Sequence, residues 1–278
     1  MAVLGLSGCS SIRLTYANGA TLAWWWIDGY VDFSGESVPR AKAAIDRWFD
    51  WHRSTQLPEY AALLAQAQPM VLEPITPQAM CRWNDQVRER LDPAIDRALV
   101  AAADLVPALG EAQWRHIERT FEKKNDEMRR DYLQPDRDDR LKASVKRAME
   151  RVEMLYGSVG EAQRKVVADG VAASPFDPEA WLAERQRRQK DVLQTLRRLA
   201  AERAGKDAIV AALRALVDRQ ERSPDPGYRS YQARLTDYNC AFAARIHNAT
   251  TPAQKQAARE RLKGWEEDLC ALAAPTSS

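Results

Sequence analysis

The chain has little glycine, no strand-like alternation and no long hydrophobic run, and each absence excludes a class of protein. Its 278 residues include 12 glycines, and no stretch alternates apolar and polar residues as a half-buried strand does. No window holds the ~20 apolar residues that a membrane-spanning helix needs. Lys and Arg together number 41 and Asp and Glu 39, so the sequence gives no sign of the strongly basic face that binds nucleic acid.

Motifs for catalysis and for metal binding are missing as well. There is no G-x-S-x-G elbow, no glycine-rich phosphate loop and no H-E-x-x-H pair. The three histidines, His52, His116 and His247, lie far apart in the sequence. We therefore expect no metal and no cofactor. Asp28 and Asp32, one helical turn apart, could serve acid–base chemistry, but carboxylates at that spacing usually face solvent, and an enzyme is the least favoured function.

What is present is helical periodicity. Ala, Arg, Leu and Glu abound, and all four favour helices. Apolar residues recur at intervals of three and four in most segments, which predicts an all-α fold: a bundle of about eight to ten antiparallel helices without a sheet. The polar stretch 134–140 is the best internal boundary. It divides an N-terminal helical half (16–134) from a C-terminal half (135–274), and we expect the two to pack as one domain.

Capping residues and prolines predict several helix ends. Asp177 precedes Pro178 and is expected to cap a long helix. Thr251 with Gln254, and Ser158 with Glu161, have the spacing of a capping box. The Leu57-Pro58 pair is expected to end one helix and start another.

Polar residues on two helices have competing interpretations. Asn125 falls on an apolar face and is expected to fix helix register by hydrogen bonding rather than to act in catalysis. The long helix from Pro178 carries a basic face. Interspersed acids such as Glu184 and Asp191 favour an ordinary solvated face, while anionic lipid headgroups are the alternative partner.

The chain begins with Leu6-Ser7-Gly8-Cys9, a pattern typical of the lipobox at which bacterial lipoproteins are cleaved and acylated. Residues 1–9 are expected to be the remainder of a signal, because only eight residues, none of them basic, precede Cys9 and a full signal is longer. Acylated Cys9 would anchor the protein to a membrane, and residues 10–15 would form the tether. Ser10 fits sorting to the outer membrane, facing the periplasm. The alternative is a cytoplasmic helical protein with a free Cys9.

Trp24, Trp25 and Trp26 are consecutive. Three successive helical residues fan across about 200° of the helix surface, so one of them must leave any single buried face. Two interpretations stay open: a central helix wrapped by neighbours on most sides, or a belt that contacts a membrane interface or a partner protein.

The remaining cysteines are Cys81, Cys240 and Cys270. If the last two helices form an antiparallel hairpin that turns near Ala249, Cys240 and Cys270 lie ~14 Å and ~32 Å from that turn at 1.5 Å per residue. A disulfide needs Cα atoms within ~7 Å. A Cys240–Cys270 bond is therefore disfavoured. Cys81–Cys240, which would tie the N-terminal half to the C-terminal hairpin, is the better candidate, with Cys270 free.

Two resemblances follow from these segments. The Cys9 lipobox, the Trp run ending in Asp28-Gly29-Tyr30, the segments 51–53 and 57–60, the Ser174–Pro178 turn with 181–188, and the segment 247–254 together resemble a proteobacterial envelope lipoprotein family of unknown function. Strings at 75–78, 109–113, 159–163 and 251–254 are similar to the LTxxQ motifs of Spy-type periplasmic chaperones, although none matches the motif in full. The first resemblance implies a helical envelope lipoprotein, and the second a chaperone.

These observations rank three functions. The first is a lipid-anchored periplasmic scaffold or accessory protein, held to the membrane through Cys9, that binds another envelope protein through aromatic residues. The second is a membrane-tethered chaperone. The third is an enzyme, for which the sequence offers the least support.

Overall fold

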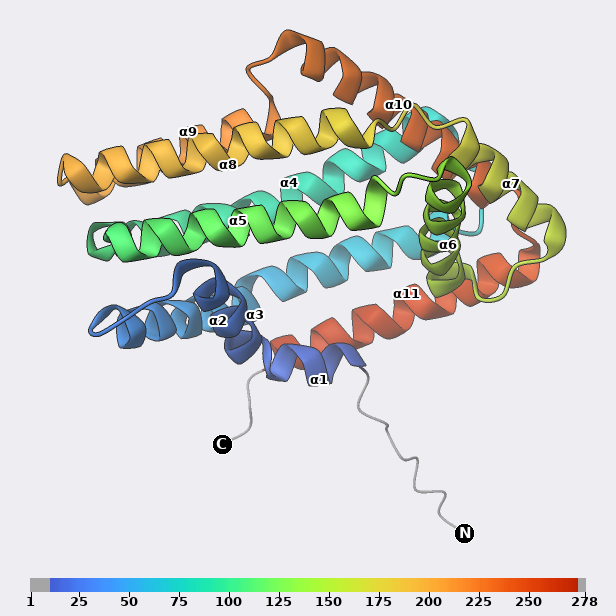
Figure 1. Cartoon of the computed structure of the whole chain (residues 1–278). Coiled ribbons are helices and arrows are strands. Elements are labelled where there is room, and N and C mark those ends of the chain that lie inside the picture. The colour runs from blue at the N-terminus through green and yellow to red at the C-terminus, as the bar shows by residue number, and fades with distance from the viewer. Residues whose placement is uncertain (1–10, 275–278) are drawn as a thin grey trace.

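In the computed structural model, residues 11–274 are described, and they form eleven α-helices and one 3-10 turn without a strand (Figure 1). The all-α prediction is confirmed. The first six helices are α1 (Ser11–Ala17), α2 (Gly19–Val31), α3 (Ser37–Met70), α4 (Pro77–Ala103), α5 (Glu111–Tyr132) and α6 (Arg137–Tyr156), with the 3-10 turn η1 at Val106–Ala108. The remaining five are α7 (Glu161–Ala172), α8 (Pro178–Ala201), α9 (Lys206–Glu221), α10 (Pro226–Asn248) and α11 (Pro252–Ala273).

The two halves of the chain are interleaved. Helix α11 runs along α3, and α10 packs on α4, so C-terminal helices lie directly against N-terminal ones. Helices α5 and α8 lie side by side, and α6 connects their end of the molecule with α11 (Figure 1). The connection between α5 and α6 falls at the polar stretch that the sequence marks as a boundary.

Apolar side chains gather in three separate clusters rather than in one core. One joins α3, α6, α7 and α11 around Val167 and Ala258. A second joins α4, η1, α8 and α9 around Ile209 and Leu199. The third lies between α5 and α8 and contains Trp114. Within residues 11–274, no helix combines the length and the apolar composition that crossing a membrane requires.

The predicted N-caps at Asp177 and Thr251 are present, and Thr76 caps a third helix in the same way. The side chains of Thr76, Asp177 and Thr251 accept backbone N–H bonds at the starts of α4, α8 and α11. The predicted capping box of Ser158 with Glu161 is wrong. Helix α7 begins two residues later, with Gly160 at the N-cap, because Gln163 folds back to accept from the Gly160 N–H at 2.9 Å.

The predicted break at Leu57-Pro58 is also wrong, because α3 continues through Pro58 to Met70. Proline removes one N–H from the helix, which normally costs stability. Here the Ser54 and Thr55 hydroxyls donate to carbonyls of the preceding turn. Leu57 is buried at the same place, so tertiary packing keeps the helix intact.

Candidate functional site

Helix α2 packs against α3 and α5. Its Gly19 lies so close to α3 that a Cβ there would overlap the Phe49 ring. At its other end, the Gly29 carbonyl accepts from His116 Nε2 at 3.1 Å. Asp28 Oδ1 accepts from the Phe33 N–H at 2.9 Å, so this carboxylate serves as a cap at the end of α2.

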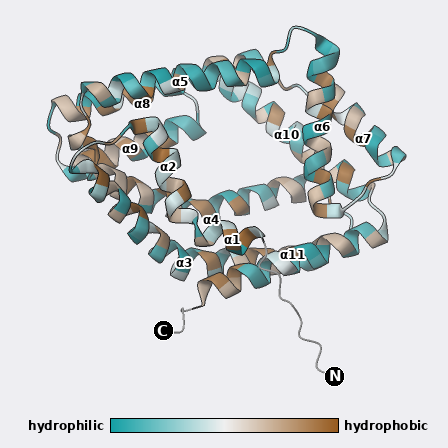
Figure 2. Cartoon of the chain, turned by 60° about the horizontal axis from the view of Figure 1, so that its bottom comes forward, coloured by the Kyte–Doolittle hydropathy of each residue, from teal (hydrophilic) through white to brown (hydrophobic). Residues whose placement is uncertain are grey.

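The opposite side of α2 presents an aromatic face, which we define as Leu22, Trp25 and Trp26. These residues lie at i, i+3 and i+4, so they share one face. Trp25 and Trp26 are 64% and 67% exposed, and no residue of α2 is buried. The interpretation of a central, wrapped helix is therefore wrong. Figure 2 shows hydrophobic residues on α2.

Trp24 differs from its two neighbours. It stacks on Phe33 at 5.9 Å between ring centroids, and Lys42 Nζ lies 4.8 Å from the centre of its ring. One tryptophan of the run is thus partly enclosed by α3 and the α2–α3 loop, while the other two face outward. Successive residues of a helix point in directions about 100° apart, so three consecutive tryptophans cannot all face the same neighbours.

Cys9 lies outside the described residues. The tether predicted at 10–15 is wrong for residues 11–15, which belong to α1. Helix α1 packs against α11, and Arg13 Nε donates to Asp268 Oδ1 at 2.6 Å. This ion pair and the helical backbone fix the segment on the body of the protein.

Cys81 of α4 and Cys240 of α10 form a disulfide with a Cα–Cα distance of 5.3 Å, while Cys270 is free and exposed. The bond closes a loop of 159 residues between the two halves of the chain. It lies where α10 packs on α4, and the predicted pair is confirmed. The assumed hairpin of the last two helices does not bring the cysteines together, because α11 packs chiefly on α3.

Two histidines are buried, and each is hydrogen bonded to a tyrosine. His52 Nδ1 lies 2.8 Å from the Tyr16 hydroxyl, and burial lowers the pKa of His52 to about 4. His247 Nε2 donates to the Glu73 carbonyl at 2.7 Å, so its Nδ1 accepts from the Tyr156 hydroxyl. Burial lowers the pKa of His247 as well. Both rings are therefore neutral elements of the core.

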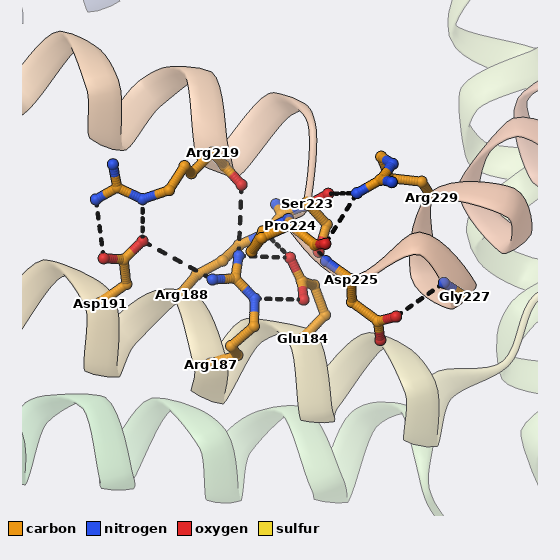
Figure 3. Close-up of polar contacts among 10 residues, drawn as sticks. All are labelled: Glu184, Arg187, Arg188, Asp191, Arg219, Ser223, Pro224, Asp225, Gly227 and Arg229. Carbon is orange, nitrogen blue, oxygen red and sulfur yellow. Dashed lines mark hydrogen bonds and ion pairs between the residues drawn. The ribbon is translucent and has the colours of Figure 1, made fainter.

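Helix α8 carries an ion cluster, shown in Figure 3, which we define as Glu184, Arg187, Arg188 and Asp191 of α8 with Arg219 of α9. Glu184 is only 5% exposed and accepts from Arg187 and Arg188 at 2.7–2.9 Å. Asp191 accepts two bonds from Arg219 of α9, both at 2.9 Å. Burial alone would raise the pKa of Glu184, but the arginine bonds outweigh it and the pKa falls below its usual range.

The turn before α10 lies against this cluster, with Ser223 and Pro224 beside Glu184. Arg229 donates to the carbonyls of Ser223 and Pro224 at 2.8 and 2.9 Å (Figure 3), and Ser223 is fully buried. The expectation that Glu184 lies on a solvated face is therefore wrong, because this turn covers it. On the α5 side of the same helix, Asn125 bonds to Arg185 and Gln189, as a register-setting residue would.

Three of the four LTxxQ-like strings have a structural explanation. Gln113, Gln163 and Gln254 each accept from the N-cap N–H of their own helix at 2.8–3.1 Å. Gln163 and Gln254 also donate to one another, which joins the starts of α7 and α11. The spacing of these glutamines therefore reflects helix capping and contacts between helix ends.

A pocket with a volume of about 850 Å³ lies where the end of α5 and the start of α8 meet α6, α7 and α10. Four arginines of α6 line it, Arg137, Arg140, Arg147 and Arg151. These arginines were not predicted as site residues, because the apolar face of α6 indicates only a bundle helix. Their spacing of three, seven and four residues was the available signal. No cluster of His, Cys, Asp and Glu within residues 11–274 could hold a metal ion.

Comparison with known proteins gives one match. A family model described as "Family of unknown function (DUF6279)" matches residues 29–229. No curated protein and no solved structure matches the chain. The match begins at Gly29, just after the aromatic face of α2, and it includes all four pocket arginines.

Proposed function

The chain belongs to DUF6279, a family of unknown function, and we propose that it is a lipid-anchored scaffold of the cell envelope that binds another envelope protein through the aromatic face of α2. The observation that carries the proposal is the exposure of Trp25 and Trp26 at 64% and 67%. Large aromatic side chains dominate the energy of protein interfaces, and exposing them costs solvation free energy without a partner.

The attachment of α2 supports a role in recognition. The helix is bonded to α5 through the Gly29 carbonyl and packs closely on α3 through Gly19. Its outward tryptophans are therefore presented on a fixed support, and little conformational entropy is lost when a partner covers them.

Lipid anchoring would place this face close to a membrane. Two peptide steps separate Cys9 from Ser11, so the chain between them can reach at most about 7 Å. Helix α1 leads into α2 at Asn18. An acyl group on Cys9 would therefore hold α1 and α2 near the bilayer surface. This arrangement is the reason to test lipid as well as protein as the neighbour of the tryptophans.

In-cell photocrosslinking tests the proposal. A photoreactive phenylalanine analogue would replace Trp25 in one strain and Trp24 in a matched strain, because Trp24 is half-covered by Phe33 and Lys42. The scaffold proposal predicts one strong protein adduct from position 25 and little from position 24. Adducts with many unrelated proteins would favour the chaperone instead, and adducts with lipid alone would contradict a protein-binding face.

Anchoring is tested separately by Cys9→Ser with a complete signal upstream. If Cys9 is acylated, the variant leaves the membrane fraction and appears in the soluble periplasmic fraction. Unchanged membrane association of Cys9→Ser would contradict the anchor.

A further inference from the structure

Within residues 11–274, four arginines of α6 lack the carboxylate partner that Arg187 and Arg188 of α8 have. Among residues 11–274, no carboxylate lies within ion-pair distance of Arg137, Arg140, Arg147 or Arg151. All four line the pocket at the junction of α5, α6, α7, α8 and α10. A set of guanidinium groups without carboxylates, gathered in one concave site, leaves charge available for an anion.

Two of these arginines are oriented by the protein. Arg147 lies over the Tyr132 ring at 4.3 Å and donates to the Asp131 carbonyl and to the Ser144 hydroxyl. Arg140 donates through Nη1 to the carbonyls of Gln134 and Pro135. Each guanidinium has five N–H donors, so both retain several for a ligand. Arg151 has no hydrogen-bond partner among the described residues and lies one turn beyond Arg147.

The other wall of the pocket is aromatic. Trp181 makes edge contacts with Tyr132 at 5.2 Å and with Phe176 at 5.7 Å between ring centroids. Phe242 of α10 also lines the pocket and approaches α7 closely, because Gly170 has no Cβ to block it. A flat apolar group would find partners on this wall, while its charged end would reach the arginines.

Two carboxylates also line the pocket, and neither neutralises the positive charge of the arginines. Asp177 accepts from the backbone N–H groups of Glu179 and Ala180 at 2.9–3.0 Å, so its charge serves the start of α8. Glu179 is exposed. Four arginines against these two acids leave the pocket with a net positive charge.

We propose that this pocket binds a small organic anion that joins a carboxylate or phosphate group to a flat apolar group, with Arg140, Arg147 and Arg151 holding the anionic end and Tyr132, Phe176 and Trp181 the apolar end. The volume of about 850 Å³ lies in the range of sites for small molecules. This inference does not depend on the proposed scaffold function, because the pocket and the aromatic face of α2 share no residue.

Calorimetric titration of the full chain with 1-naphthyl phosphate tests the proposal. 1-Naphthoate replaces the phosphate by a carboxylate, inorganic phosphate lacks the ring, and 1-naphthol lacks the charge. We expect saturable 1:1 binding of one or both naphthyl anions, and at least tenfold weaker binding of phosphate and naphthol. Whichever naphthyl anion binds more tightly identifies the charged group. Equal binding of naphthol would overturn the role of the arginines, and equal binding of phosphate would overturn the role of the rings.

Matched variants locate the site. Arg151→Gln removes one charge that has no ion pair or hydrogen bond among residues 11–274. We expect it to weaken binding about tenfold, the loss of one charge-assisted hydrogen bond. Lys146→Gln removes a charge from the same helix outside this pocket, and Trp25→Ala alters the aromatic face of α2. Both should bind as the natural protein does. Absence of saturable binding, or equal weakening by Arg151→Gln and Lys146→Gln, would contradict the proposal.

Discussion

Helices α8 and α6 both carry several arginines on one side, but their surroundings differ. On α8, Arg187 and Arg188 bond to Glu184, and Arg219 of α9 adds a two-bond contact to Asp191 (Figure 3). On α6, the arginines that line the pocket meet carbonyl groups, a hydroxyl and an aromatic ring, and no carboxylate within residues 11–274.

This difference separates two uses of the same side chain. A guanidinium bonded to a buried carboxylate satisfies a group that would otherwise be costly to bury, so its removal is expected to affect folding. A guanidinium without a carboxylate contributes little to folding and keeps its donors for a ligand. The α8 cluster is therefore structural, and the α6 set is the better candidate for recognition.

Lowering the pH should destabilise the protein through its buried histidines before the pH is low enough to protonate Glu184 of α8. This is the largest effect that we expect. The pKa of His52 is about 4 in the folded chain against 6.5 in a model peptide. Between these values the unfolded chain takes up a proton that the folded one does not, so the free energy of unfolding falls as pH decreases from 6.5 to 4. The loss attributable to His52 is on the order of 3 kcal/mol, and His247 adds to it.

Urea unfolding at pH 7, 6, 5 and 4 measures this loss. In His52→Gln the loss should be smaller, because one titrating group is gone. A free energy of unfolding that stays constant from pH 7 to pH 5 would contradict the neutral, buried state of both histidines.

Opening the α8 cluster should have the next largest effect. Glu184→Gln keeps the shape but removes the charge that Arg187 and Arg188 share, and we expect a loss of about 2 kcal/mol at pH 7. Because the pKa of Glu184 is lowered by folding, its contribution is present above its ordinary pKa and disappears as pH falls through the lower folded value. Chemical unfolding of Glu202→Gln is the control, since Glu202 pairs with Arg198 in solvent and should matter by less than about 0.5 kcal/mol.

A smaller loss is expected for Arg219→Gln, about 1 kcal/mol, because the side chain of Arg219 is 38% exposed and its pair with Asp191 is partly screened by water. The unfolding midpoint in urea measures it. A loss as large as that of Glu184→Gln would mean that the cluster acts as one cooperative unit.

Arg151→Gln should have the smallest effect on folding, within about 0.5 kcal/mol, since nothing in residues 11–274 pairs with this side chain. The same urea experiment checks it. A loss of 1 kcal/mol or more would reveal a structural role and would remove the contrast between α6 and α8.

Local signals in the sequence predict much of the fold. Periodicity identifies the all-α class, and the caps at Asp177 and Thr251 lie where side-chain chemistry places them. The predicted helix end at Pro58 is wrong, because proline usually breaks a helix, whereas packing around buried Leu57 keeps α3 continuous. The Cys81–Cys240 prediction is confirmed, but helix rise argues only against a Cys240–Cys270 bond. The hairpin of the last two helices that this argument assumes is not the main packing, because α10 packs on α4 and α11 on α3.

The pocket could not be found in this way. Its charged wall is one face of α6, but its aromatic wall combines Tyr132, Phe176 and Trp181 with Phe242 of α10. Only the tertiary arrangement brings these segments together. The burial of Glu184 could not be predicted from the local sequence either, because the Ser223-Pro224 turn that covers it lies about forty residues away in the sequence.

The most direct test of the contrast between the two helices compares the thermal unfolding midpoints of Arg151→Gln and Arg219→Gln with and without ligand. The ligand is whichever of 1-naphthyl phosphate and 1-naphthoate binds the natural protein more tightly. A ligand that binds only the folded state raises this midpoint. We predict that Arg219→Gln starts from a lower midpoint and keeps the full shift, whereas Arg151→Gln starts from the natural midpoint and loses most of it. Equal shifts in the two variants would contradict the assignment of α6 to recognition and of α8 to structure.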